Sequence, residues 1–153
     1  MTLYELLLFV HISAAIVWIG GAAMHVALVL LARRAGERAQ QLAFLHYDDL
    51  LGLRLYLPAT LVVLAAGIGL VLEGGWDWGQ TWIVLGLILF ALAFLFGVAY
   101  FLPQGKKLHE AIAAHGPDAA EVTAAMQRIY LGAWVDLTIL FAAVFVMTVK
   151  PGL

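Results

Sequence analysis

Four long apolar stretches fill most of this chain and limit the folds open to it. They cover roughly residues 3–32, 50–72, 82–102 and 129–149. Each reaches the ~20 residues that an α-helix needs to cross about 30 Å of hydrocarbon. Because unpaired backbone groups are not tolerated against lipid, all four stretches are predicted to be helical. We therefore expect an all-α membrane protein with a single domain, an antiparallel bundle of four transmembrane helices.

The composition supports the same class of protein. The chain is 65% hydrophobic and only 12% charged, with a mean hydropathy of +1.00. A soluble domain has about a quarter of its residues charged, so the lipid bilayer is the expected partner of most of this surface. The net charge of -2 gives no electrostatic argument for binding nucleic acid. The absence of cysteine excludes disulfides, iron–sulfur clusters and thiolate metal sites.

The basic residues predict how the helices are oriented. All of the lysines and arginines except Lys150 lie in or beside the loops 33–49 and 104–128. Loops rich in lysine and arginine stay on the cytoplasmic side of a membrane, so both of these loops are predicted to be cytoplasmic. Both termini are then expected on the outer side, in the periplasm or outside the cell. The predicted location is a bacterial cell inner (plasma) membrane, crossed several times.

Local signals predict where helices end and bend. Gly36 is expected to end the first helix, and Gly116-Pro117 breaks the connection between the third and fourth helices. Asp118 is a predicted N-cap for a fourth helix that starts near Ala119, before the membrane. Pro58 is expected to kink the second helix. The helices should therefore project into the cytoplasm beyond the bilayer. In the third helix, Ala93 and Gly97 form a small-xxx-small pair that predicts close helix packing.

The first helix carries Tyr4, His11, Trp18 and His25 at intervals of seven residues. Seven residues make nearly two helical turns, so the four side chains are predicted to share one stripe. Histidines at membrane depth are costly unless they are buried in protein, and they indicate a functional site. Neutral imidazole is a good axial ligand for haem iron and also binds copper or zinc. His11 and His25 are therefore candidate haem or metal ligands, and Trp18 is a candidate pocket wall.

The two histidines lie fourteen residues apart, or ~21 Å along a helix axis. This spacing resembles the way in which membrane b-type cytochromes hold two haems on one helix, but the other three spans contain no histidine. A homodimer could supply the missing ligands across a two-fold axis. Alternatively, both histidines are hydrogen-bonded inside the bundle with no cofactor. Haem b, copper and the absence of any cofactor all stay open at this point.

Two charged residues are also expected at membrane depth. Arg54 lies one turn into the second helix from the cytoplasm, and Asp136 lies about two turns into the fourth. Intramembrane charges usually pair, so Arg54 and Asp136 are predicted to form an ion pair near His25. The pair would act either as a structural clasp or as a proton or anion site. Alternatively, Arg54 snorkels to the surface and Asp136 is hydrogen-bonded locally.

A second polar group precedes the second apolar stretch. The segment His46-Tyr47-Asp48-Asp49 has the composition of a cation site. It is expected instead to start the second helix at the membrane interface.

The run from His11 to Gly21 resembles a first-helix signature, His-x6-Trp-x-Gly/Ala-Gly, of the CopD copper-resistance proteins and of HemJ-type protoporphyrinogen oxidases. The whole chain is similar to a bacterial family of predicted four-helix membrane proteins with no assigned function. The shared features are His11, Trp18, Pro58 and the C-terminal run 149–153. The HemJ likeness implies that His11 holds haem. The third helix has no lysine like the one that those enzymes use, so porphyrinogen oxidation is not implied.

The CopD likeness implies copper handling, although the methionine-rich segments that favour Cu(I) are missing. Together the residues and the resemblance favour a haem- or metal-binding subunit that transfers electrons, taking them from quinol or from a partner complex. One alternative is a non-catalytic accessory protein of a larger membrane complex. Another is a small transporter that uses the Arg54–Asp136 site. Whether the chain is an enzyme stays open.

Overall fold

The computed structural model describes residues 1–153, apart from the side chains of Asp48 and Asp49. The described backbone contains four long helices and no strand. The first helix comprises α1 (Leu3–Ala15), the π-helical turn η1 (Ile16–Gly20) and α2 (Gly21–Arg34). The second comprises α3 (Arg38–Leu51), η2 (Gly52–Tyr56) and α4 (Leu57–Glu73). The third comprises α5 (Thr81–Phe96), η3 (Gly97–Phe101) and α6 (Leu102–His115), and the fourth is α7 (Ala120–Val149).

All four helices are long and apolar enough to cross a bilayer, which confirms the predicted number of spans. The second helix begins at Arg38, well before residue 50, and Leu42 and Leu45 in its first turns pack against α6 and α7. His46-Tyr47-Asp48-Asp49 therefore lies inside this helix instead of starting it. The possibility that the segment itself binds a cation falls partly on the side chains of Asp48 and Asp49, which lie outside the described residues.

The fourth helix begins at Ala120, close to the predicted position, but its N-cap differs from the prediction. Ala119 is the N-cap and provides no side-chain hydrogen bond, while Asp118 lies in the preceding turn. A longer-range contact holds this turn, since the Arg38 guanidinium donates to the backbone oxygen of Pro117 at 2.7 and 3.1 Å. A contact between residues 79 positions apart cannot be read from local sequence.

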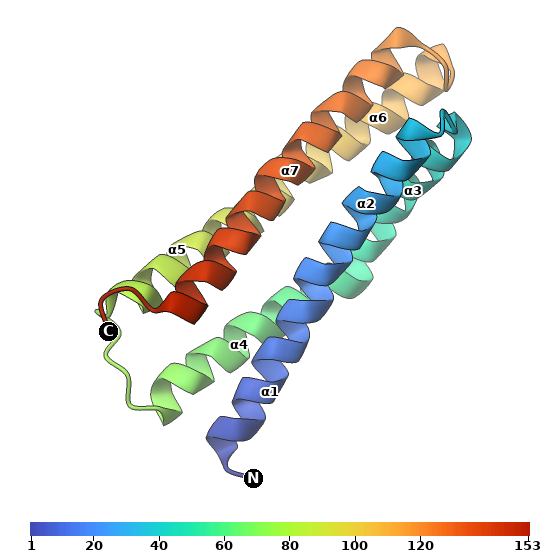
Figure 1. Ribbon diagram of the computed structural model, residues 1–153. Helices are drawn as coiled ribbons and strands as arrows, with labels where there is room; N and C mark the ends of the chain where they lie inside the picture. Colours follow the sequence, from blue (N-terminus) through green and yellow to red (C-terminus); the bar gives the residue numbers. More distant parts are fainter.

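The helices are arranged as two pairs. In the first pair, α1 lies along α4 and α2 along α3; in the second pair, α5 and α6 both lie along α7. The pairs touch where α2 meets α7 and α3 meets α6. Figure 1 shows them leaning apart toward the end that carries the N-terminus, whereas the turns at Gly36 and Gly116 lie together at the opposite end. We call this opposite end the turn end.

Three buried clusters hold the two pairs together. The cluster at the turn end joins α3, α6 and α7, and consists of Leu45, Leu108, Val122, Ala125, Met126 and Ile129. The middle cluster joins α5 and α7 to the first helix through Ala93, Leu137 and Leu140, with Trp18, Ile19, Ala22, Ala23 and Val26 packed against them. The third cluster lies at the opposite end from the turns and consists of Val71, Trp82, Ile83 and Val146.

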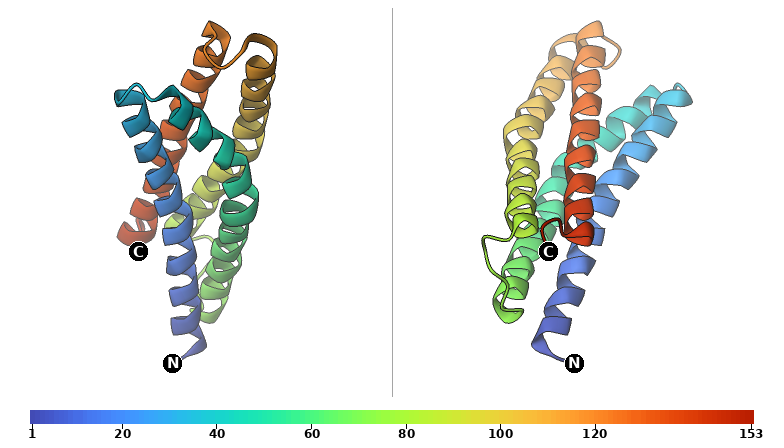
Figure 2. Two further views of the ribbon diagram at one scale, coloured as in Figure 1. Left: turned by 90° about the vertical axis from the view of Figure 1, so that its right-hand side faces the viewer. Right: turned by 60° about the vertical axis from the view of Figure 1, so that its left-hand side comes forward.

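The π-helical turns η2 and η3 each precede a proline. Pro58 is the second residue of α4 and Pro103 the second residue of α6. Proline has no N–H to donate, and its ring clashes with the carbonyl one turn back. A π turn lets the chain bend without exposing that carbonyl, because its hydrogen bonds reach one residue further. Figure 2 shows the resulting change of direction between α3 and α4, which agrees with the kink expected at Pro58.

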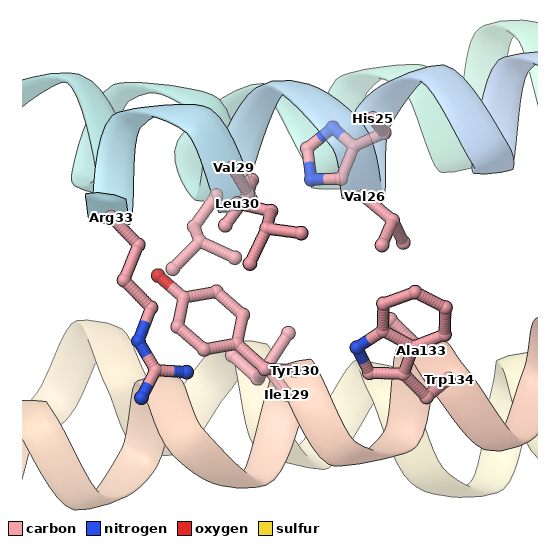
Figure 3. A pocket seen from close by; sticks show the side chains of 10 residues that line it. His25, Val26, Val29, Leu30, Arg33, Ile129, Tyr130, Ala133 and Trp134 are labelled. Atoms are coloured by element: carbon pink, nitrogen blue, oxygen red, sulfur yellow. The ribbon is translucent and has the colours of Figure 1, made fainter. Parts of the chain in front are cut away.

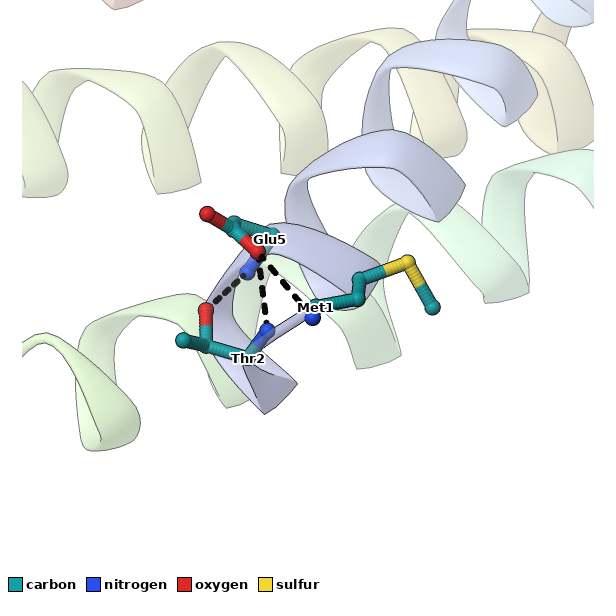
Figure 4. Close-up of polar contacts among 3 residues, drawn as sticks. All are labelled: Met1, Thr2 and Glu5. Atoms are coloured by element: carbon teal, nitrogen blue, oxygen red, sulfur yellow. Dashed lines mark hydrogen bonds and ion pairs between the residues drawn. The ribbon is translucent and has the colours of Figure 1, made fainter.

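The first helix begins with a capping box, shown in Figure 4. The backbone N–H of Thr2 donates to Glu5 Oε2 at 2.8 Å, and the N–H of Glu5 donates to Thr2 Oγ1 at 3.2 Å. The amino group of Met1 lies 4.0 Å from the same carboxylate. These contacts satisfy N–H groups that no earlier turn of helix can pair.

Close packing in the second pair depends on a glycine that the sequence analysis did not select. A side-chain carbon on Gly132 of α7 would collide with the ring of Tyr100, whose hydroxyl donates to the backbone oxygen of Arg128 at 2.9 Å. In contrast, a side chain at Gly97 would meet nothing within 4 Å. Ala93 is buried as predicted, at 3% exposure, but Gly97 is not a packing position.

We predict that Gly132→Leu lowers the stability of the protein and Gly97→Leu does not. The added side chain at Gly132 must displace a ring that its own hydrogen bond holds in place, and overpacking of this kind costs about 1–3 kcal/mol. Thermal unfolding in mild detergent, followed by circular dichroism, measures the difference. Equal losses of stability in the two variants would contradict the packing described for the second pair.

Candidate functional site

His11 lies on α1 and turns its ring toward α4. Its Nδ1 atom is 2.8 Å from the backbone oxygen of Val63. A carbonyl oxygen can only accept, so Nδ1 carries the proton. In the neutral ring the lone pair is then on Nε2. The hydrogen bond therefore fixes both the tautomer and the orientation of the imidazole.

A glycine makes room for this ring. A side-chain carbon on Gly67 would lie 3.1 Å from Cε1 and 3.3 Å from Nδ1 of His11. The imidazole thus packs against bare backbone of α4. Gly67 lies one turn before Val71, which packs against Trp82 and Val146 of the second pair. Gly67 and Val71 therefore share one face of α4, and His11 packs where α1 lies along α4.

Trp18 lies in the π turn η1 and contacts the second pair directly. Its ring meets that of Phe90 edge to face, with the centroids 5.9 Å apart. It also packs against the cluster of Ala93, Leu137 and Leu140. The position supports a structural role for Trp18 at the boundary between the two pairs.

The π turn changes where His25 points. One π turn holds an additional residue, which rotates the helix that follows by about 100° relative to an unbroken α-helix. The expectation that His11 and His25 share one stripe is therefore wrong, because it assumed 3.6 residues per turn throughout. His11 contacts α4, whereas His25 faces a cavity between α2 and α7.

The cavity beside His25 has a polar rim, shown in Figure 3. It is lined by His25, Val26, Val29, Leu30, Arg33, Leu45, Ile129, Tyr130, Ala133 and Trp134. Its volume is about 40 Å³, which is enough for a few water molecules and far too small for a porphyrin.

A chain of polar contacts supports one wall of this cavity. The guanidinium of Arg33 lies 5.7 Å from the centre of the Tyr130 ring. The Tyr130 hydroxyl donates to Gln41 Oε1 at 3.2 Å, and Gln41 Nε2 in turn lies 3.4 Å from the backbone oxygen of Ala32. Gln41 is only 8% exposed, so these contacts join α2, α3 and α7 in a protected place.

The structure does not bring Arg54 and Asp136 together. Arg54 lies in the π turn η2, is exposed, and lines an apolar groove between α1 and the start of α4. Asp136 is half-buried on α7, one turn beyond the cavity residue Ala133. Among the described side chains, none of the ion pairs joins these two residues. Arg54 instead lies beside Phe9 and Ser13 of α1 in this groove.

A comparison with known protein families matches residues 5–151 to a single family model, described as "Predicted integral membrane protein (DUF2269)". The chain belongs to this family. No curated protein and no solved structure matches it. Membership in the DUF2269 family and the four long apolar helices agree that this is an integral, multi-pass membrane protein. The family description assigns no activity.

In this DUF2269 protein, few side chains that could bind a metal ion lie close together. No group of three or more histidine, aspartate or glutamate side chains that could hold a metal ion occurs among the described residues. Haem differs, because its iron takes only one or two protein ligands. Sequence reasoning found His11 but missed its partner, Val63, since a backbone carbonyl leaves no sequence signal. Gly67, a glycine inside an otherwise apolar helix, was the only local hint of that contact.

We predict that Gly67 and His11 are energetically coupled. Gly67→Ala should stabilise the protein more in a His11→Ala background than in the native chain, because the clash with the imidazole is then gone. Contacting residues typically show coupling energies of about 0.5–3 kcal/mol in a double-mutant cycle. Gly20→Ala is the control, since a side chain there meets nothing within 4 Å. Additive effects of Gly67→Ala and His11→Ala would mean that the two residues do not touch.

Proposed function

We propose that this membrane protein binds haem b through His11 and serves as an electron-transfer subunit. The observation that carries the proposal is the hydrogen bond from His11 Nδ1 to the backbone oxygen of Val63. Histidines that ligate metals almost always donate their other ring N–H to a carbonyl or carboxylate, which orients the ring and makes the ligating nitrogen more basic. The His11 ring has this arrangement, with the lone pair of Nε2 left for iron.

The donor set suits haem better than a bare metal ion. One imidazole suffices as an axial ligand of haem, whereas copper needs further side chains, and no three-residue group is found among the described residues. His25 lies fourteen residues from His11, or ~21 Å along the helix axis, and therefore cannot ligate the same iron. The cavity beside His25 is too small for a porphyrin. We therefore propose that a haem would be held by His11, and that a second copy of the chain would supply a further ligand.

The remaining residues would support redox chemistry without touching iron. A bound haem b would supply one-electron transfer. The Val63 carbonyl and the bare backbone at Gly67 hold the His11 ring in one orientation. His25, Arg33 and Tyr130 surround space for a few waters, and this polar group would be the candidate proton site of the proposed subunit. The transporter alternative loses its proposed site, since Arg54 and Asp136 lie apart.

The proposed orientation is an antiparallel bundle in a bacterial inner membrane, with the turn end in the cytoplasm and both termini outside. The support is the charge distribution. Arg33, Arg34, Arg38, Lys106 and Lys107 all belong to the segments of α2, α3 and α6 that lead to the turn end. Only Lys150 lies at the opposite end, where its ammonium lies 5.0 Å from the Trp76 ring and 4.9 Å from the Trp82 ring.

We predict that cysteine labelling reports this orientation. The chain has no cysteine, so a single introduced thiol gives a clean signal. Lys107→Cys should resist a membrane-impermeant maleimide in intact cells and react after lysis, whereas Leu153→Cys should react in intact cells. The reverse pattern would show that the turn end faces outward.

We predict that the protein purified after expression with ample haem shows a Soret band and sharp reduced α and β bands. His11→Ala should lose these bands, because no other imidazole lies at that position. His115→Ala, which changes an exposed histidine at the end of α6, should keep the full spectrum. A colourless native protein, or a spectrum that His11→Ala leaves unchanged, would refute haem binding by His11 and favour the accessory-protein interpretation.

A further inference from the structure

Two imidazoles from distant parts of the chain lie close together at the turn end. His46 lies on α3 and His109 on α6, so the two come from different helix pairs. Their ring centroids are 5.9 Å apart, and the ring planes are at 77° to each other. Both side chains are exposed. An ion in water could therefore reach them without crossing the apolar core.

One ring is already oriented as a ligand would be. His109 Nδ1 lies 2.9 Å from the backbone oxygen of Gly105, one turn earlier on α6. Because a carbonyl only accepts, Nδ1 is the donor in this hydrogen bond. This is the same arrangement that metal-ligating histidines show in known sites.

The distance between the rings also suits one shared ion. Zinc binds imidazole nitrogen at about 2.0–2.1 Å in tetrahedral geometry, which places the centroids of two ligating rings roughly 5–6 Å apart. The observed 5.9 Å lies at the upper end of this range. A small rotation of either exposed side chain would therefore complete the geometry.

We propose that His46 and His109 bind a zinc ion that joins α3 to α6 at the turn end. Nitrogen ligands select late transition metals over Mg²⁺ and Ca²⁺, which prefer oxygen. Since both side chains are exposed, water can reach the ion and it exchanges with solution. Since α3 and α6 belong to different pairs, bound zinc holds the two pairs together where the turn-end cluster already packs them. This proposal does not depend on haem.

The test is zinc binding by the full-length protein in detergent, free of haem and without a polyhistidine tag. Isothermal titration with ZnCl2 should give one ion per chain, and zinc should raise the melting temperature where MgCl2 does not. His46→Ala and His109→Ala should each weaken binding by about tenfold or more and abolish the thermal shift. His115→Ala, an exposed histidine on the same helix as His109, should behave as the native protein does.

Other results would overturn the proposal. The proposal is wrong if zinc does not bind stoichiometrically, or if the native protein and both variants bind it equally. It is also wrong if each variant loses half of the bound zinc and the two losses add, because the histidines would then bind zinc independently. A conservative variant separates ligation from folding: His46→Cys replaces one ligand by another and should keep zinc binding, while His46→Ala loses it. In addition, His46→Cys combined with His109→Cys should cross-link within one chain under mild oxidation if α3 and α6 lie as described.

Discussion

In hydrocarbon, each backbone N–H and C=O group must find a partner within the protein, and this requirement shapes the whole molecule. It makes the four apolar stretches helical and keeps them helical through Pro58 and Pro103, where an ordinary α-helix would lose a hydrogen bond. The solution at both prolines is a π turn in the segment before them, η2 and η3. The helices stay continuous through both prolines, and the second helix changes direction there.

A π turn also changes which side chains are in contact. The first helix contains a π turn without proline, η1, and it rotates α2 relative to α1. His11 therefore contacts α4 within the first pair, and His25 faces α7 in the second pair. A stripe that looks continuous in the sequence becomes two separate sites, one with an oriented imidazole and one with a small polar cavity. The oriented imidazole of His11 and the cavity beside His25 are therefore separate features of the first helix.

The sequence predicted the features that depend on composition and local signals. The four apolar spans, the ends of the helices near Gly36 and Gly116, and the bend at Pro58 follow from hydropathy and from the chemistry of glycine and proline. His11 and His25 stood out because imidazole is costly in lipid. Features that depend on contacts between distant segments could not be read in this way. The Val63 carbonyl, the collision that Gly132 avoids with Tyr100, and the approach of His46 to His109 all arise only when the helices pack.

Haem binding by His11 depends on a ring held through Nδ1, with the lone pair on Nε2. Solid-state nitrogen-15 NMR of the protein in lipid, with labelled histidine and His11→Ala for assignment, measures this tautomer. We predict that His11 has a protonated Nδ1 and an unprotonated Nε2, and that the Nε2 signal alone is strongly shifted or broadened when haem is added. A protonated Nε2 with a bare Nδ1, or a spectrum that haem leaves unchanged, would contradict it.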